Sequence, residues 1–294
     1  MSEARQLSFA EFLTARHSLW LERTYGVASA VDDASLRSFR FTNLWRELDR
    51  GTVYLFNEVQ QRFLHDTTML ICHSILYRVF NHADPYERVS REFGDYFYLD
   101  SKASDLFSFI KELPIGCSAA YARQVNVQKT SEQLTRLQPH ALEIEKALIA
   151  GDALAVRKAV LKIYSIGKFT ADQATMDFCW EGGPFAGSDF SPSLGPGARD
   201  GLETCRLSGD GDDLSRLLLV GDSALETDTR PTVGGRAVRF DMRALEHSLC
   251  EFSKYVKTHN RAAPGRAGKR VYSPASSPAG LPYSWSPPPR VSRF

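Results

Sequence analysis

One stretch constrains this chain more than any other part of it. Residues 39–50 read Phe-Arg-Phe-Thr-Asn-Leu-Trp-Arg-Glu-Leu-Asp-Arg. Apolar residues recur three and four positions apart from Phe41 to Val59, which is the period of a helix with one buried face. The spacing therefore predicts a long helix over residues 42–63 with an apolar stripe directed into a core.

The opposite side of this helix carries polar residues at helical spacing: Asn43, Arg46, Glu47, Asp49 and Arg50. A charge run of this kind commonly marks a solvated face with ion pairs that contribute little stability. Arginines beside aromatic residues also suit the recognition of phosphates and bases. Trp45 lies on the apolar stripe, so we expect it in the core.

Charge is unevenly distributed along the 294 residues, whose net charge is +1. Residues 261–294 hold six Arg or Lys and no acidic residue, so residues 1–260 carry −5 (+1 minus +6). Any nucleic-acid site on the folded part must therefore be a local patch. The last segment also holds seven prolines, which predicts a basic disordered tail, either inert or an electrostatic tether for DNA.

The spacing of the cysteines and the hydropathy of the chain indicate the compartment in which the protein is expected. The five cysteines include no Cys-x-x-Cys pair, and an odd number argues against a complete disulfide framework. The N-terminus has no apolar signal core, and no apolar run reaches membrane-spanning length. We therefore expect an intracellular protein without a membrane partner, in the nucleus of a eukaryote or in the host cytoplasm for a virus.

Helical periods recur through the rest of the chain, and no long stretch alternates with a period of two. Ser8 and Glu11 form a capping-box pattern ahead of a helix that runs to about Tyr25. We therefore expect an all-α fold, with a helical domain over residues 1–260 that contains a loop-rich insert at about 206–236. The tail of residues 261–294 follows this domain.

A glycine turn between two predicted helices is the second informative element. Gly167 turns the chain, and the next helix starts near Phe169. Such a turn can offer backbone N–H groups and a helix N-terminus to a DNA phosphate, and Lys168 adds a full charge. Asp177 follows on the second helix, as a candidate base or as an ordinary helix-end charge. Because any αα-corner can use a glycine, the turn alone leaves both interpretations open.

Two later motifs complete the set. In Gly195-Pro-Gly-Ala-Arg-Asp-Gly201, adjacent glycines let a backbone approach a ligand closely, and Arg199 stands at the start of a predicted helix; an ordinary glycine loop is the alternative. No GxxxxGK[ST] pattern occurs in the sequence, so a kinase would lack its phosphate cradle. On the last predicted helix, residues 241–257, Glu251 and Lys254 are three apart and can pair or contribute to a site.

These motifs, in this order, resemble the signature of the α-glutamyl/putrescinyl-thymine pyrophosphorylase family, also described as amino acid:DNA transferases. The resemblance extends over roughly residues 8–258 and is most specific at residues 40–50. Arg16, His17 and Arg23 also resemble that family's first helix, whereas residues 28–33 depart from its usual pattern. The resemblance implies a fold like that of helix-hairpin-helix DNA glycosylases; a related helical domain accompanies 5-hydroxymethyluracil DNA kinases.

The resemblance also implies a reaction on double-stranded DNA that carries pyrophosphorylated 5-hydroxymethyluracil, in which a small amine (an amino acid or a polyamine) displaces pyrophosphate. Cations are then needed at the leaving group, a carboxylate must take the proton of the amine, and aromatic residues suit a base outside the stack. We assign Arg46, Arg50, Arg199 and Lys254 to the pyrophosphate, Glu47, Asp49 and Asp177 to the base role, Asn43 to the uracil edge, and Gly167 and Lys168 to DNA. The motifs identify no cofactor with certainty, and a divalent metal is one further way of binding the leaving group.

Two alternatives stay open at this point. A DNA glycosylase of this fold would carry its aspartate some way beyond the hairpin, where Asp189 stands. A non-catalytic helix-hairpin-helix module would bind DNA, and its charge clusters would be structural.

Overall fold

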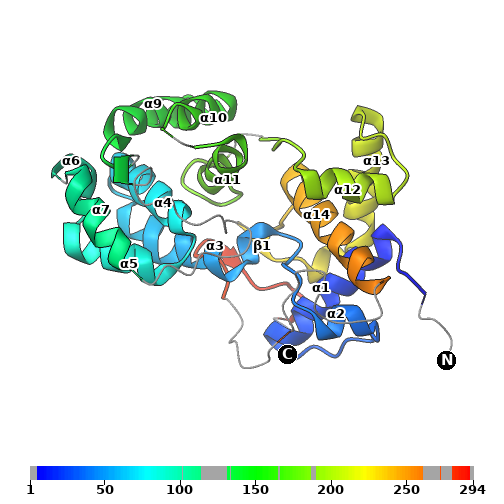
Figure 1. Cartoon of the computed structure of the whole chain (residues 1–294). Coiled ribbons are helices and arrows are strands. Elements are labelled where there is room, and N and C mark those ends of the chain that lie inside the picture. The colour runs from blue at the N-terminus through cyan, green and yellow to red at the C-terminus, as the bar shows by residue number, and fades with distance from the viewer. Residues whose placement is uncertain are drawn as a thin grey trace. The chain divides into compact units, whose positions relative to one another are not determined.

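The computed structural model describes residues 5–100, 102–113, 131–132, 134–164, 166–186, 190–260, 272 and 280–291 (Figure 1). The chain divides into two compact units: unit 1 comprises Met1–Arg50 and Ser191–Phe294, and unit 2 comprises Gly51–Phe190. Unit 1 is therefore built from both ends of the chain, and unit 2 is one continuous segment. The predicted all-α class is confirmed, because helices dominate and the strands among the described residues are three short ones.

Helices from both ends of the sequence form unit 1: α1 (Phe9–Tyr25), α2 (Ala34–Ser38), α12 (Pro196–Thr204), α13 (Gly211–Ala224) and α14 (Met242–His259), with the 3-10 turns η1 (Arg46–Leu48) and η4 (Thr227–Thr229). The capping box before α1 is confirmed, since Ser8 Oγ accepts the Glu11 N–H and the Ser8 N–H donates to the Glu11 carboxylate at 2.8 Å. The helix ends at Gly26, whose φ of 73° is a left-handed value that glycine adopts without strain.

Aromatic side chains join α1 to α14 in the core of unit 1. The centroid of the Phe12 ring lies 5.4 Å from that of Phe252 and 5.3 Å from that of Tyr255. Phe9 makes an edge-to-face contact with Phe252, with centroids 5.4 Å apart. Aromatic pairs of this kind contribute about 1 kcal/mol beyond their buried area, so these contacts stabilise the association of the two ends of the chain.

Helix α12 packs closely along α14, and two glycines make the approach possible (Figure 1). A Cβ atom on Gly197 would lie 2.5 Å from Cys250 Sγ, and one on Gly201 would overlap the Leu249 carbonyl oxygen. Neither glycine can therefore carry a side chain unless the helices move apart. We expected the glycines of residues 195–201 to allow a ligand to approach, but the space beside Gly197 and Gly201 is filled by a neighbouring helix.

Three two-residue strands form a small antiparallel sheet in the order β2–β1–β3: β1 (Thr232–Val233), β2 (Arg236–Ala237) and β3 (Trp285–Ser286). Thr232 pairs with Ala237 on one side and with Ser286 on the other. Strand β3 belongs to the segment that we predicted to be a disordered tail, but residues 280–291 of that segment are ordered, with Trp285 buried at 6% exposure. Residues 261–271, 273–279 and 292–294 of that tail lie outside the described residues.

The segment over residues 206–236, which we expected to be rich in loops, contains α13 as well as loops. Asp210 caps this helix by accepting the Asp213 N–H at 2.9 Å. Leu217 is buried, and Gly221 lies so close to the Phe240 ring that a Cβ atom would overlap it. The capping residue and the close packing explain why a segment of low apolar periodicity is helical.

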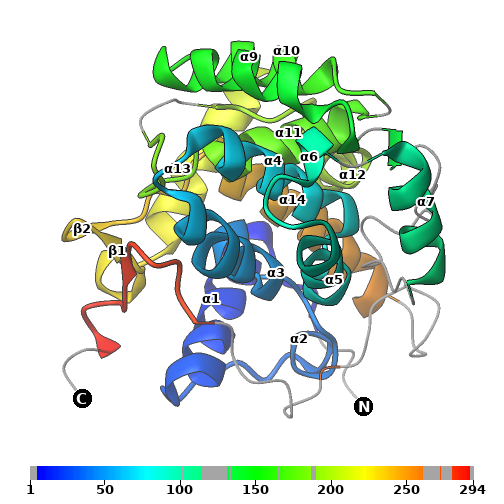
Figure 2. The same cartoon turned by 90° about the vertical axis from the view of Figure 1, so that its left-hand side faces the viewer.

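Unit 2 is built around α4 (Thr67–Phe80), in which nearly every side chain from Met69 to Phe80 is buried. The other helical segments from Arg50 to Phe178 include α3 (Arg50–Tyr54), the π-helical turn η2 (Leu55–Gln60), η3 (Gln61–Phe63), α5 (Ala83–Phe93), α6 (Phe97–Asp100), α7 (Ala103–Glu112), α9 (Leu137–Ile149), α10 (Ala153–Leu161) and α11 (Lys168–Phe178). Helices α9 and α10 lie side by side (Figures 1 and 2). Within the described ranges, no helix combines the length and the hydropathy that crossing a membrane requires.

The long helix predicted over residues 42–63 is wrong for its first part. Residues 41–45 are irregular, η1 is a single turn, and Asp49 has extended backbone angles (φ −72°, ψ 136°). Bonds between side chains and backbone replace the helical ladder: Asn43 Nδ2 donates to the Leu48 carbonyl at 2.8 Å, and Asp49 Oδ1 accepts the Asn43 N–H at 3.2 Å. Asn and Asp compete with helix formation in this way. The apolar stripe is nevertheless buried, and the prediction that Trp45 belongs to the core is confirmed by its 2% exposure.

Candidate active site

Two carboxylates of unit 1 converge on residues 41–49, which we call the site loop. Glu251 on α14 accepts the Thr42 N–H through Oε2 at 3.0 Å, and Asp49 accepts the neighbouring Asn43 N–H at 3.2 Å. Glu251 is 3% exposed, whereas the Asp49 side chain is 26% exposed. The site loop therefore holds one buried and one partly buried carboxylate on consecutive backbone amides.

The Asp49 carboxyl group has an unusual acidity. Burial raises the pKa of Asp49 to about 7; the hydrogen bond from the Asn43 N–H opposes this shift, and the charge of Glu251 adds to it. His247 on α14 lies close by, with Nε2 3.6 Å from Asp49 Oδ2. A carboxyl group with a pKa near neutrality exchanges its proton at the pH of a cell, which is what a general base requires.

A cation stands next to Glu251, one of the two carboxylates. Lys254 forms an ion pair with Glu251, with Nζ 2.6 Å from Oε1, so the pairing suggested by the sequence is confirmed. Burial lowers the pKa of Lys254, but the charges and hydrogen bonds of Glu251 and Cys250 together outweigh this effect, and the pKa is raised above its ordinary value. Lys254 is therefore an ammonium group at neutral pH, and its side chain is 43% exposed.

The polar ridge predicted for residues 43–50 does not form, because the first part of the predicted helix is absent. Arg46 and Glu47 are each 7% exposed, whereas Arg50 is exposed. Burial raises the pKa of Glu47, and the nearby charge of Arg243 opposes this shift. Arg46 and Glu47 thus belong to the interior of unit 1, and of these three residues only Arg50 is open to solvent.

Arg199 lies in the first turn of α12, where the sequence predicted a helix start. Its side chain is exposed, and its N–H donates to the Gly195 carbonyl at 3.0 Å. The next residue, Asp200, pairs with Lys257 of α14 at 2.5 Å. Arg199 therefore belongs to the same unit as Asp49 and Lys254, although it takes part in none of the site-loop contacts described above.

Asp177 belongs to unit 2 and is fully buried. Arg78 on α4 donates to both oxygens of its carboxylate, through Nε at 2.5 Å and through Nη2 at 2.8 Å. Arg78 also donates to Asn81 Oδ1 and to Thr52 Oγ1. Because both carboxylate oxygens accept from one buried guanidinium, this geometry favours a structural role for Asp177 over the role of a base.

The predicted glycine turn is present between α10 and α11. Gly167 is the N-cap residue of α11, is exposed, and has open space where a Cβ atom would lie. Lys168 and Phe169 are exposed at the helix start, and Tyr164 before the turn is 42% exposed. The tip of this hairpin thus presents a cation and two aromatic rings to solvent, a combination that suits contact with phosphates and bases.

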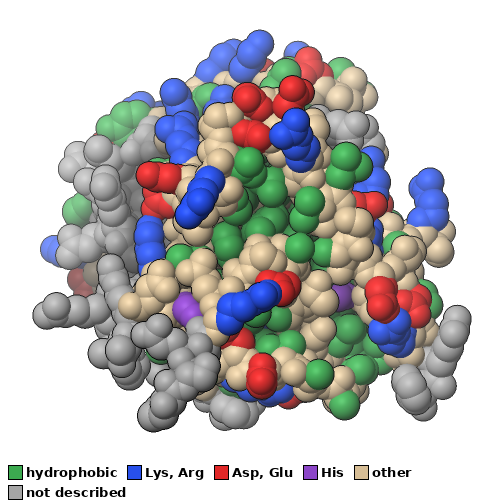
Figure 3. Space-filling model, turned by 90° about the vertical axis from the view of Figure 1, so that its right-hand side faces the viewer, with side chains coloured by type: hydrophobic (Ala, Val, Ile, Leu, Met, Phe, Trp, Pro, Cys, Tyr) green, Lys and Arg blue, Asp and Glu red, His purple; other side chains and the backbone are tan. Residues whose placement is uncertain are grey.

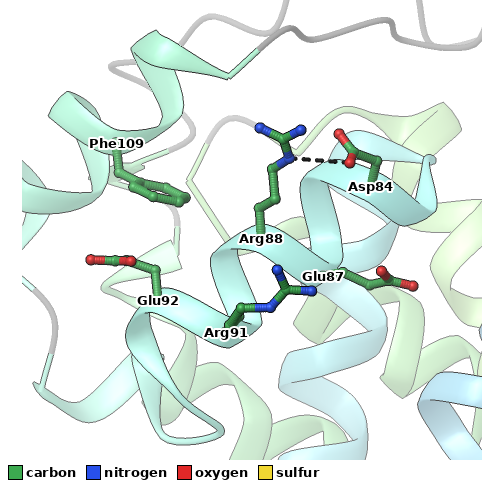
Figure 4. Close-up of a pocket in the computed structure, with 6 residues that line it drawn as sticks. All are labelled: Asp84, Glu87, Arg88, Arg91, Glu92 and Phe109. Carbon is green, nitrogen blue, oxygen red and sulfur yellow. Dashed lines mark hydrogen bonds and ion pairs between the residues drawn. The ribbon is translucent and has the colours of Figure 1, made fainter.

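Charges of both signs are interspersed on the described surface. On the face drawn in Figure 3, Lys and Arg side chains alternate with Asp and Glu around a group of hydrophobic side chains. A surface pocket of about 330 Å³ has the same mixed character (Figure 4), with the lining residues Asp84, Glu87, Arg88, Arg91, Glu92 and Phe109. Arg88 in this pocket is paired with Asp84 at 3.1 Å. The mixed charge of these two surfaces agrees with the low net charge of the chain. Any DNA-binding site would therefore have to be a local patch.

Two residues join the site loop without having been predicted for the site. His247 approaches Asp49 from α14, and Arg16 on α1 donates to the Phe41 and Thr42 carbonyl oxygens. Helical spacing relates residues only within one helix, so no pattern in the sequence could connect either residue to the site loop. The resemblance of Arg16 to a residue of a family helix was the one signal that pointed to it.

Metal binding was an open expectation from the sequence. Among the described residues, no group of three or more His, Cys, Asp or Glu side chains is arranged to hold a metal ion. Asp49 and Glu251 accept backbone N–H groups of the site loop, and Glu251 is also paired with Lys254.

Comparison with known proteins identifies a family. Residues 4–264 match the family model described as 5-hmdU DNA kinase, helical domain. No curated protein and no solved structure matches the chain. The matched range includes the site loop, the hairpin and α14, so every site element described above lies within it. The chain therefore belongs to the family of 5-hmdU DNA kinase helical domains, and with it to the proteins of 5-hydroxymethyluracil DNA modification.

Proposed function

We propose that this protein is a transferase that modifies bases in DNA, in which an amine displaces pyrophosphate from pyrophosphorylated 5-hydroxymethyluracil. The amine nitrogen attacks the 5-methylene carbon, and the C–N bond forms as the C–O bond to pyrophosphate breaks. Pyrophosphate leaves with the electron pair, and the proton that the nitrogen must lose passes to a carboxylate. Membership of a family named for 5-hmdU supports the choice of the modified base.

The observation that carries this proposal is the Asp49 carboxyl group, whose pKa is about 7. In its ionised form this group accepts the proton of a primary amine during or after attack. Glu47 and Asp177, the other two predicted bases, are 7% and 0% exposed, so a substrate in solvent reaches neither of them directly. We therefore assign the base role to Asp49.

Exposed cations of unit 1 suit the leaving group. Lys254 is an ammonium group beside Glu251, and Arg50 and Arg199 are exposed. Cations at the departing oxygens stabilise the negative charge that develops as pyrophosphate leaves. Arg46 is buried, and its charge instead lowers the pKa of Asp49. Asn43 uses its side-chain amide to close the site loop, so we give it that role in place of a contact with the uracil edge.

The hairpin of unit 2 suits the DNA backbone. The N-terminus of α11, which begins at Lys168, carries the partial positive charge of a helix start, and Lys168 adds a full positive charge there. Phosphate contacts of this kind position DNA without reading its sequence. Gly167 and Lys168 therefore keep the DNA-binding role that the sequence predicted for them.

Nucleoside mass spectrometry tests the proposal. The protein is incubated with DNA that carries pyrophosphorylated 5-hydroxymethyluracil and with a mixed pool of amines. A heavier thymidine analogue is expected, and its mass identifies the amine. Asp49→Asn should abolish this product, whereas Asp84→Asn, which changes an exposed carboxylate on α5, should retain it. A free base with an abasic site would mean a DNA glycosylase instead; Asp189, the candidate aspartate for that reaction, lies outside the described residues.

The family description favours a second candidate, because it names the helical domain of a kinase. The 294 residues have no GxxxxGK[ST] pattern, so they would recognise modified DNA on behalf of a kinase domain that lies outside them. Unchanged DNA in the mass-spectrometric experiment would support this candidate, provided that the protein binds DNA with 5-hydroxymethyluracil in a salt-dependent manner.

A further inference from the structure

The site loop is held on its carbonyl side by one buried arginine. Arg16 Nη2 donates to the Phe41 carbonyl and to the Thr42 carbonyl, each at 2.8 Å. These two carbonyls belong to consecutive peptide groups of the site loop. Both bonds come from one guanidinium nitrogen, so the two peptide planes cannot rotate without losing a charge-assisted hydrogen bond.

The same two peptide groups are held on their N–H side by the carboxylates of the site. The N–H of the first peptide group belongs to Thr42 and donates to Glu251, and that of the second belongs to Asn43 and donates to Asp49. Each peptide group therefore has the guanidinium of Arg16 on its oxygen and a carboxylate on its nitrogen. We call this arrangement the peptide relay.

Through the peptide relay, two carboxylates that do not touch Arg16 compensate its buried positive charge. Arg16 is 3% exposed, and a buried guanidinium is costly unless negative charge balances it. Within the described residues no carboxylate forms an ion pair with Arg16 directly. Burial lowers the pKa of Arg16 to about 10, with the negative charges of Glu251 and Asp49 acting to raise it, so the guanidinium is charged at neutral pH. Hydrogen bonds in series polarise one another, and each peptide group thus transmits the charge of Arg16 to a carboxylate.

We propose that Arg16 is a positioning residue of the candidate active site, which acts through the peptide relay to fix the site loop and to favour the ionised state of Asp49. The effect of Arg16 on turnover rests on the proposed function, whereas the effect of Arg16 on Asp49 is a property of the folded protein alone.

The direction of this effect follows from the groups that surround Asp49. They come from α1, from α14 and from the chain around the site loop: Arg16, His247, Glu251 with its partner Lys254, Arg40 and Arg46. Glu251 opposes the ionisation of Asp49, and the arginines favour it. Removing Arg16 takes away a cation and loosens the Asn43 N–H bond, and both changes make Asp49 a weaker acid.

The test is an NMR titration of protein labelled at the aspartate carboxyl carbons, in which Asp49→Asn assigns the Asp49 signal. In the wild-type protein the Asn43 amide proton should titrate together with Asp49, because it donates to that carboxylate. In Arg16→Gln we expect the Asp49 pKa to rise by about one unit and the Thr42 and Asn43 amides to exchange faster. Arg16→Lys keeps the charge without the planar guanidinium and should give a smaller rise.

Arg23 provides a matched control on the same helix. Its Nη2 also donates to two consecutive carbonyls, those of Leu36 and Arg37, at 3.3 and 3.4 Å. The N–H between them, that of Arg37, donates to the Asp33 carbonyl and to no carboxylate of the site. Arg23→Gln should therefore leave the Asp49 pKa close to its wild-type value.

An Asp49 pKa that is equal in Arg16→Gln and in the wild type would overturn the proposal. If Arg16→Gln does not fold, the wild-type titration decides: an Asn43 amide proton that does not follow Asp49 would overturn it equally. The pH–rate profile then separates the two proposals. Arg16→Gln could shift the Asp49 pKa in the NMR titration without shifting the low-pH side of the pH–rate profile. That result would establish the peptide relay and would show that Asp49 is not the base.

Discussion

Removing the Asp177 carboxylate should destabilise unit 2 strongly. Asp177 is 0% exposed and Arg78 is 3% exposed, and the guanidinium donates to both carboxylate oxygens. In Asp177→Ala this guanidinium stays buried without its counter-charge, and breaking one partner of such a pair costs about 3–5 kcal/mol. At a urea m-value of about 2 kcal/mol/M, a loss of about 4 kcal/mol lowers the unfolding midpoint by about 2 M.

The midpoint is measured by hydrogen exchange of α4 and α11 at increasing urea concentration, which reports on unit 2 specifically. Asp84→Ala removes one partner of an ion pair whose side chains are 47% and 48% exposed, and it should leave the midpoint almost unchanged. The double variant Arg78→Met/Asp177→Leu should recover much of the loss, because no buried charge is left without a partner. A wild-type midpoint in Asp177→Ala would refute the structural role and restore Asp177 as a candidate base.

Three further predictions follow from the contacts of unit 1. Because the pKa of Asp49 is about 7 in the folded protein against an ordinary value of 3.8, Asp49 holds an extra proton in the folded state between these pH values, and its own contribution to stability falls as pH rises through that window. Asp49→Asn should remove this component, which is read as the difference in thermal midpoint between variant and wild type at pH 4 and pH 8. Gly201→Ala should cost about 1–3 kcal/mol because α12 must move away from α14, whereas Gly167→Ala, with open space beside it, should cost far less in the same urea titration. Trp285→Ala should cost roughly 3 kcal/mol, and limited proteolysis should then cut residues 280–291 faster than in the wild type.

The spacing of apolar residues predicted burial better than it predicted helices. Phe41, Leu44, Trp45 and Leu48 are 4%, 3%, 2% and 2% exposed, as the apolar stripe required. They are buried without the helix that the same spacing predicted, because hydrophobic burial requires only that apolar residues reach the core. The backbone between them is determined by side-chain bonds of Asn43 and Asp49, which compete with the helical ladder.

The sequence by itself determined the all-α class, the bounds and caps of the first helix, the hairpin turn and the family-level link to modified DNA. Each of these depends on residues that lie close together in the chain or on a motif read in order. The burial of Asp177 against Arg78, by contrast, could be known only from the fold, because Arg78 comes from another helix.

Only the tertiary structure decided how the candidate site works. It joined Arg16 of α1 and Glu251 of α14 to the two peptide groups of the site loop, and it brought His247 next to Asp49. These contacts connect segments far apart in the sequence, which no local period relates. The pKa of Asp49 is likewise a property of the folded state, because burial raises it, and burial arises only when both ends of the chain pack together.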